Sequence, residues 1–320
     1  MLSRRQVIRQ VMFGGLSACC LPLRRARAVS TATLREIALG IHVRRGVDED
    51  AAPGNADAIA NAGFIIGRES VLVFDPGGSR ADGAQLRAAI RALTTLPIRH
   101  VVMSHAHPDH VFGAGAFLDD QPAFVGHARL AAALATRGEY YRERLEAVLG
   151  AGAAGPPVLP TLEVKDRLEL DLGGRVVRLT AHPLAHTDSD LTLLDVASGT
   201  LFCGDLLFVG RVPALDGSVL GWLQVLDALK AAAAAQGATG GATQAVPGHG
   251  PERVDWPAGA ADLERYLRTL VQETRQAVKD NIGIAAAVER VAAGERGRWT
   301  LFEAYNGRNV TQAYKELEWE

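Results

Sequence analysis

The most informative stretch of the chain runs Ile98-Arg99-His100-Val101-Val102-Met103-Ser104-His105-Ala106-His107-Pro108-Asp109-His110-Val111-Phe112-Gly113. Its apolar residues 101–103 predict a buried strand, and a cluster of polar side chains follows at the carboxyl end of that strand. His105 and His107 are two positions apart, so in an extended backbone both side chains point the same way, close enough to bind one cation. A lone pair of histidines at this spacing is more often a polar loop with chance histidines, but four ligand-type side chains within six residues favour a metal site.

The same cluster continues with a second pair of ligand-type side chains. Pro108 is expected to bend the chain and to keep a helix from starting at once. Asp109 and His110 would then point elsewhere, toward a second cation. Three imidazoles and one carboxylate at the end of one buried strand therefore predict a metal site with room for two ions.

Further candidate ligands follow predicted strands in the second half of the chain. They are His186, Asp205 and His249, so that five of the nine histidines lie in strand-end loops. Gly204 and Gly248 each precede a candidate ligand, where a residue without a side chain lets the backbone turn tightly beneath a metal. Random placement of histidines would not give this distribution.

Apolar periodicity predicts the other elements of the fold. Strands are expected at 34–43, 63–66, 71–74, 101–103, 123–125, 168–170, 176–180, 191–195, 201–203 and 245–246. Helices are expected at 80–93, 112–117, 128–149, 220–235 and 256–280, with a loop rich in Gly and Pro at 150–160. Two similar halves of strands and helices predict two sheets packed together, with helices covering both outer faces.

Taken together, these blocks resemble the metallo-β-lactamase-fold hydrolases over about residues 34–255. The residues that carry the resemblance are His105-Ala106-His107-Pro108-Asp109-His110, His186, Asp205 and His249, with Asp75 upstream. The resemblance implies an α+β fold, a four-layer αβ/βα sandwich with a dinuclear site on one edge. It implies one metal bound by His105, His107 and His186, a second bound by Asp109, His110 and His249, and a bridging Asp205. Asp75 would orient ligands through hydrogen bonds.

Within this superfamily, the bridging carboxylate at Asp205 is similar to the glyoxalase II and lactonase branches. True β-lactamases of the fold lack an acid there, which argues against antibiotic hydrolysis. Residues 104–113, 204–218 and 316–320 resemble most closely the quinoprotein relay system zinc metallohydrolases. These are exported proteins associated with alcohol-oxidising quinoproteins, so the resemblance implies a periplasmic quinoprotein as partner.

The ligand set itself indicates the chemistry. Two divalent cations can hold one hydroxide between them, lower its pKa toward neutrality and stabilise a developing oxyanion. Asp109 is the expected catalytic residue, because a carboxylate beside the water can orient it or move its proton. The prediction is a hydrolase with two Zn²⁺ that cleaves an ester, thioester or lactone of a small molecule. Two alternatives remain: an oxidoreductase of the sulfur dioxygenase type that uses one iron, and a non-catalytic accessory protein.

The amino terminus has the features of an export signal. A twin-arginine pattern at 3–8 precedes an apolar segment at 11–23 and a small-x-small cleavage pattern that ends at Ala28. Residues 1–28 are therefore expected to be a twin-arginine signal, 29–255 the metallo-β-lactamase-like domain, and 256–320 a helical extension packed on it. Cys19 also fits a lipoprotein box, so the periplasmic protein is expected to be either free or lipid-anchored.

Composition narrows the function classes further. The net charge of −2 over 320 residues gives no electrostatic reason to expect a nucleic-acid partner, and no apolar run is long enough to span a bilayer. Among the other polar residues, His182 is expected to make a structural hydrogen bond, and His127 to lie in a surface or turn position. Arg211 is expected either to meet an anionic substrate group or to be a solvated loop residue. Cys203 and Trp222 are expected to pack in the core.

Overall fold

The computed structural model describes residues 34–236 and 241–320 of the chain. The expected signal at 1–28, with Cys19 and Cys20, lies outside the described residues. Within those ranges, seven strands form the first sheet in sequence order, from β1 to β7. Their bounds are β1 (Leu34–Ala38), β2 (Ile41–Arg44), β3 (Ala62–Ile66), β4 (Val71–Phe74), β5 (Ile98–Val102), β6 (Ala123–His127) and β7 (Leu162–Val164). Strands β1 to β4 are antiparallel, whereas β4 to β7 run parallel.

The second sheet has the order β13-β12-β11-β10-β9-β8. Its strands are β8 (Arg167–Asp171), β9 (Val176–Ala181), β10 (Leu191–Asp195), β11 (Thr200–Phe208), β12 (Gln244–His249) and β13 (Val254–Asp255). The pair β11 and β12 is parallel, and the other pairs are antiparallel. Parallel pairing at the middle of the sheet brings the carboxyl ends of β11 and β12 to the same edge.

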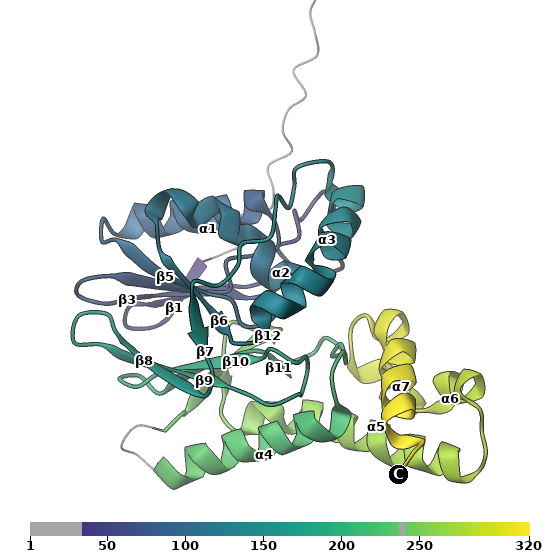
Figure 1. The fold of residues 1–320 in the computed structure, drawn as a ribbon. Coiled ribbons are helices and arrows are strands. Elements are labelled where there is room, and N and C mark those ends of the chain that lie inside the picture. Colours follow the sequence, from purple (N-terminus) through teal and green to yellow (C-terminus); the bar gives the residue numbers. More distant parts are fainter. Residues whose placement is uncertain (1–33, 237–240) are drawn as a thin grey trace, which may run out of the picture.

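Helices cover the outer face of each sheet (Figure 1). Above the first sheet lie α1 (Arg80–Leu93), α2 (Pro108–Val111), the short helix η1 (Phe112–Asp120) and α3 (Leu130–Leu149). Below the second sheet lie α4 (Val219–Gln236) and α5 (Ala261–Lys279), the latter after the turn η3 (Ala258–Ala260). The chain ends with α6 (Ile284–Arg290), η4 (Ala293–Arg298) and α7 (Phe302–Leu317).

Apolar side chains from both sheets meet between them. The first sheet contributes Ile41, Val43, Ile65, Leu72, Phe74, Val102 and Val125, and the second contributes Val177, Leu179, Leu191, Leu193, Phe202 and Val246. Alternate residues of each strand therefore face this inner core, while the others pack under the helices. The four-layer αβ/βα sandwich predicted from the sequence is confirmed.

Three local expectations were wrong. The strand expected at 34–43 is a hairpin of β1 and β2, because Gly40 adopts a φ of +68° and turns the chain. Pro108 does not delay a helix but occupies the first turn of α2, where its missing N–H is not needed. The strand expected at 201–203 extends to Phe208, with a pairing irregularity at Gly204.

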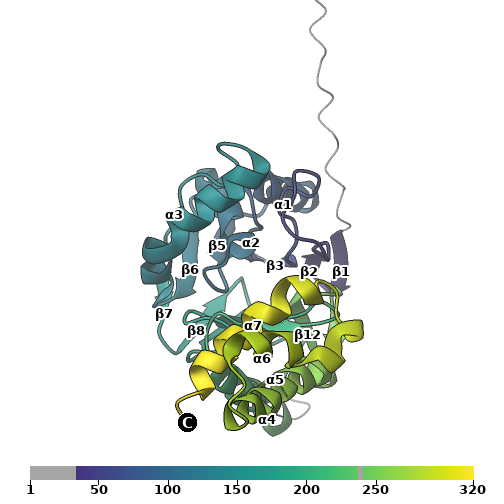
Figure 2. The same cartoon turned by 90° about the vertical axis from the view of Figure 1, so that its right-hand side faces the viewer.

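The carboxyl-terminal helices pack against the second sheet. Trp222 of α4, Tyr266 and Leu267 of α5, and Val310 of α7 belong to one buried apolar cluster that also includes residues of β11. Figure 2, turned by 90°, shows α5, α6 and α7 in front of the second sheet. Over residues 34–236 and 241–320, no helix has the length and apolar character that a bilayer crossing requires.

Candidate metal centre

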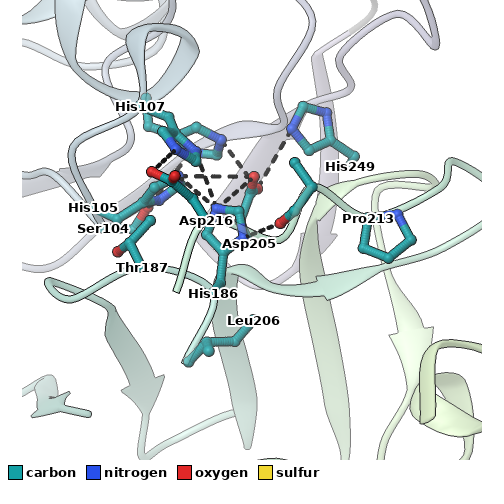
Figure 3. Close-up of polar contacts among 12 residues, drawn as sticks. Ser104, His105, His107, His186, Thr187, Asp205, Leu206, Pro213, Asp216 and His249 are labelled. Carbon is teal, nitrogen blue, oxygen red and sulfur yellow. Dashed lines mark hydrogen bonds and ion pairs between the residues drawn. The ribbon is translucent and has the colours of Figure 1, made fainter. Parts of the chain in front are cut away.

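The candidate ligands come from loops and strands that meet at one edge of the sandwich. Side chains after β5 face side chains from the β9–β10 loop, from β11 and from the end of β12 (Figure 3). In the described part of the chain, two groups have the geometry to hold an ion. They are His105, His107, His186 and Asp205, and Asp109, His110 and His249. All seven residues predicted as ligands are thus brought together.

Nitrogen atoms of the first group converge on one point. His186 Nε2 lies 3.2 Å from His105 Nε2 and 3.0 Å from His107 Nδ1. Burial lowers the pKa of His105 well below its usual value and that of His186 to about 3, so both rings are neutral near pH 7. Lone pairs that face one another in this way suit a shared cation, because metal-bound histidines are neutral.

The second group is arranged around carboxylates. Asp109 Oδ2 lies 3.2 Å from His249 Nε2 and 3.5 Å from His110 Nε2. Burial alone would lower the pKa of His110, but the neighbouring carboxylates, Asp205 first, outweigh it and raise that pKa well above its usual value. The carboxylates around His110 thus favour positive charge at this position, which a bound cation would also supply.

Asp205 lies between the two groups and is 4% exposed. Its Oδ1 is 3.1 Å from His110 Nε2 and 3.4 Å from His249 Nε2. Its Oδ2 is 3.4 Å from His186 Nε2 and 3.8 Å from His105 Nε2. Each carboxylate oxygen thus faces a different group, which is the placement that a bridging ligand requires.

Glycines on both sides of Asp205 let the backbone approach closely. Gly204 has a φ of +50°, and a Cβ there would lie 2.8 Å from the side chain of Ser104. A Cβ on Gly248 would lie 2.0 Å from Asp205 Oδ1. The tight turn expected beneath the metal ligands therefore depends on the absence of side chains at both positions.

Each candidate histidine also bonds through its outer ring nitrogen. His110 Nδ1 lies 2.7 Å from Asp75 Oδ2, and His186 Nδ1 lies 2.6 Å from the carbonyl oxygen of Ala214. With a proton on the outer nitrogen, the ring donates to these oxygens and turns its other lone pair toward the cluster. Asp75 also accepts bonds from the backbone N–H and the hydroxyl of Ser104, so its own position is fixed.

Two residues that support candidate ligands, Asp216 and Ala214, were not singled out from the sequence. Asp216 Oδ2 lies 3.4 Å from His107 Nε2 and also bonds to Arg137 on α3. The Ala214 carbonyl that accepts the hydrogen bond from His186 Nδ1 is a backbone group. Asp216 lies inside the 204–218 segment quoted for the family resemblance, whereas a carbonyl contact leaves no signal in side-chain type.

The surroundings of His249 correct one expectation. Arg211 is 4% exposed, so it is not a solvated loop residue. Its Nη1 donates to the Glu49 carbonyl and lies 3.2 Å from His249 Nδ1, and its Nη2 donates to the Tyr305 hydroxyl. His249 Nδ1 is also 3.0 Å from the Ile59 carbonyl, which can accept its proton. Arg211 thus packs behind a candidate ligand.

An unsatisfied pair of atoms tests whether these residues fit metal ions. His110 Nε2 and Asp205 Oδ1 are buried and make no hydrogen bond with suitable geometry. Buried polar atoms without partners are rare in native proteins because each costs about 1–3 kcal/mol. Both atoms point to the centre of the cluster, where coordination would satisfy them. Imidazole nitrogens and carboxylate oxygens are ligands that zinc and iron accept, so the residues fit.

Other polar residues follow their simpler interpretations. His182 Nε2 bonds to the Thr192 hydroxyl at 2.8 Å, away from the candidate ligands, as expected for a structural histidine. His127 is a turn residue whose Nδ1 accepts the Arg129 N–H, but it is buried rather than at the surface. Cys203 is buried in the core as expected.

Comparisons with known proteins identify the family of the fold. A family model described as metallo-beta-lactamase superfamily matches residues 56–271. A linear primary-alkylsulfatase from Pseudomonas sp. (strain ATCC 19151) is 31% identical over 67 residues, which are 21% of this chain and 13% of that protein. The chain therefore matches only a small part of that relative's length.

Solved structures share the fold at low sequence identity. A metallo-beta-lactamase from Pontibacter korlensis is 16% identical with a TM-score of 0.58, covering 74% of this chain and 98% of that one. The stereoselective inverting sec-alkylsulfatase Pisa1 from Pseudomonas sp. is 16% identical with a TM-score of 0.63, covering 89% of this chain and 50% of that one. Because the family model covers most of the sandwich, the chain belongs to the metallo-beta-lactamase superfamily.

Proposed function

We propose that the protein is a dinuclear zinc hydrolase that cleaves an ester, thioester or lactone bond of a small molecule. The observation that carries the proposal is the position of Asp205, with one oxygen toward each group of candidate ligands. When bound, a pair of divalent cations supplies a hydroxide nucleophile at neutral pH and polarises the substrate oxygen.

In this proposal the chain's own residues have distinct tasks. His105, His107 and His186 hold one ion, and Asp109, His110 and His249 hold the other, with Asp205 between them. Asp109 is the catalytic residue: its side chain is 13% exposed, against 3% or less for His110, His249 and Asp205. A carboxylate at the open side of the cluster can orient the attacking water and receive its proton.

A second candidate substrate class is a sulfate ester. It is supported by the local similarity to a linear primary-alkylsulfatase. Against it, the two arginines bonded to the cluster or its supports are already paired. Arg211 bonds to a carbonyl and a hydroxyl, and Arg137 bonds to Asp216. Neither offers a free guanidinium to a sulfate, so we prefer uncharged acyl substrates to sulfate esters as the substrate class.

The test begins with metal content of protein purified without added metal, measured by inductively coupled plasma mass spectrometry. About two zinc ions per chain support the proposal, and about one iron ion would replace it with oxygen-dependent sulfur chemistry. Absence of metal even after reconstitution would refute both. Hydrolysis is then screened on esters, thioesters, lactones and alkyl sulfates, and the class cleaved decides between the two substrate proposals.

A pair of variants tests the role of Asp205. Asp205→Ala is expected to lose one or both ions and nearly all hydrolysis. Asp195→Asn is the matched control, because Asp195 is equally buried but bonds to Arg175 and Ser198 at the end of β10. If Asp205→Ala keeps both ions and full activity, the bridging assignment is wrong.

We also propose that residues 1–28 direct twin-arginine export and that the mature enzyme serves a periplasmic quinoprotein. The support is the sequence pattern at 3–8 and the resemblance of residues 104–113 and 204–218. Cell fractionation of the full chain and of an Arg4→Lys, Arg5→Lys variant tests the export. The variant is expected to stay in the cytoplasm, and palmitate labelling that requires Cys19 would indicate a lipid anchor instead of cleavage at Ala28.

A further inference from the structure

One face of α7 carries a row of polar side chains that bond to a single segment, residues 211–220. The row consists of Tyr305, Asn309, Gln312 and Glu316, at helical spacings of four, three and four that place them on the same side. Figure 2 shows α7 in front of the second sheet, near β12, the strand that ends at His249.

The contacts of this row follow the segment in order. Tyr305 receives a bond from Arg211 Nη2, and Asn309 bonds to Pro213 and Leu215. Gln312 donates to the carbonyl of Gly217 at 2.8 Å. Glu316 accepts from the Ser218 hydroxyl at 2.6 Å and from the Val219 N–H at 2.8 Å, at the start of α4. The segment is therefore held along its whole length.

The same segment supports two candidate metal ligands from behind and lies beside a third. Its Ala214 carbonyl lies 2.6 Å from His186 Nδ1, and its Asp216 carboxylate lies 3.4 Å from His107 Nε2. Arg211 lies 3.2 Å from His249 Nδ1. A shift of this segment would rotate or release the imidazoles of His186 and His107, because the bond at the outer nitrogen sets the direction of each ring.

Asn309 has the most direct influence. It is 1% exposed, its Oδ1 accepts the Leu215 N–H at 2.9 Å, and its Nδ2 donates to the Pro213 carbonyl at 2.7 Å. These two bonds bracket Ala214, so Asn309 fixes the carbonyl that holds His186. Figure 3 shows Pro213 beside this part of the cluster.

We propose that α7 is a clamp that sets the geometry of the metal ligands, with Asn309 as a positioning residue for His186. This inference rests on the proposed metal-binding function. It goes beyond the family assignment, because the matched region ends at residue 271, before α7 begins. The carboxyl-terminal extension would then be a working part of the metal centre and not only a cover for the second sheet.

The test compares Asn309→Ala with Asn306→Ala. Asn306 lies on the same helix, is 5% exposed and makes two side-chain bonds, to Tyr266 and to the Val291 carbonyl. It shares the Tyr266 hydroxyl with Asn309 Nδ2 but has no hydrogen bond to residues 211–220. Both variants lose buried hydrogen bonds and are expected to unfold at similar, lower temperatures without metal. Only Asn309→Ala is expected to bind one of the two zinc equivalents about 10–100-fold more weakly in competition with a chromophoric chelator.

Cobalt substitution gives a readout that simple destabilisation would not move. The visible spectrum of the Co²⁺ protein should change in Asn309→Ala at one equivalent and match wild type in Asn306→Ala. Equal loss of affinity in both variants, or unchanged affinity in Asn309→Ala, would overturn the clamp. Wild-type protein that binds no metal would instead overturn the proposed function.

A milder variant keeps the test decisive if Asn309→Ala does not fold. Gln312→Ala removes one partly buried bond, to the carbonyl next to Asp216. It should weaken zinc binding at the His107 side by a few fold while leaving the fold intact. Affinity equal to wild type in folded Gln312→Ala would then overturn the clamp.

Discussion

Replacing Asp75 by Asn removes a support of the second candidate metal group without removing a ligand. Asp75 is 1% exposed, its Oδ2 accepts from His110 Nδ1 at 2.7 Å, and its other oxygen accepts the Ser104 N–H at 2.8 Å. An amide of the same shape can keep one oxygen toward Ser104. Its NH₂ group then faces His110 Nδ1 and can only donate. The ring must move its proton to Nε2, the nitrogen that faces the cluster.

The magnitude follows from this change of tautomer. A proton on Nε2 blocks the lone pair that a metal would use, so binding requires the unfavourable tautomer or a rotated ring. Loss of such an outer partner typically weakens metal binding about 10–100-fold, which corresponds to about 1.4–2.8 kcal/mol. We expect one of two zinc equivalents in Asp75→Asn to show this loss and the other to change little.

Chelator competition monitored at two zinc equivalents measures both affinities. Asp195→Asn serves again as control, because it replaces a fully buried carboxylate bonded to Arg175 with no contact to the cluster. The control should lose stability but keep both affinities. Unchanged zinc binding by Asp75→Asn would show that the Asp75–His110 bond does not direct the imidazole and would refute the reasoning.

Three other perturbations test the surrounding structure. Burial lowers the pKa of His182 from 6.5 to about 4, so the folded state favours the neutral ring. Burial of the neutral ring costs no stability above pH 6.5. As the pH falls toward 4, the free energy of unfolding decreases by about 3 kcal/mol. In urea unfolding, His182→Gln should therefore lose less stability than wild type as the pH falls over this range. Equal losses in the two proteins would show that His182 is not a buried neutral histidine. Gly248→Ala places a Cβ 2.0 Å from Asp205 Oδ1. It should lower the free energy of unfolding by about 1–3 kcal/mol and displace that carboxylate. The control Gly115→Ala, whose added Cβ has no neighbour within 4 Å, should change neither thermal stability nor metal content. Removing metal with a chelator should lower the unfolding temperature. Relative to protein held with free zinc at 100 times its Kd, the free energy of unfolding should fall by about 2.7 kcal/mol. Calorimetry that shows no shift would argue against a metal bound to the folded state.

The sequence was informative where chemistry depends on side-chain type and short spacing. His105 and His107 at a spacing of two, followed by Asp109 and His110, predicted two neighbouring groups, and the structure places these side chains within reach of one another. The order of strands and helices likewise predicted the sandwich. Both depend on local patterns, which survive folding because a strand has a period of two and a helix a period of 3.6.

The sequence was less informative where position depends on backbone geometry. The extension of β11 to Phe208 and the break at Gly204 arise from parallel pairing with β12, which is distant in sequence. The supports of His186 and His249 are carbonyls of Ala214 and Ile59, and every residue has a carbonyl. The hairpin at Gly40 is different, since a glycine between two short alternating runs is a recognisable turn signal.

The supports of the cluster also explain why the site depends on the whole fold. Asn61, just before β3 in the first sheet, donates to the Pro247 carbonyl at 2.8 Å, and its own N–H bonds to the Gly248 carbonyl at 2.7 Å. These contacts join the first sheet to the end of β12, next to His249. Because the candidate ligands from one sheet are thus held by groups from the other, the metal geometry can form only after the two sheets have packed together. Metal binding should therefore be strongly coupled to the packing of the two sheets against each other. Variants at Asn61 should change metal affinity and stability together.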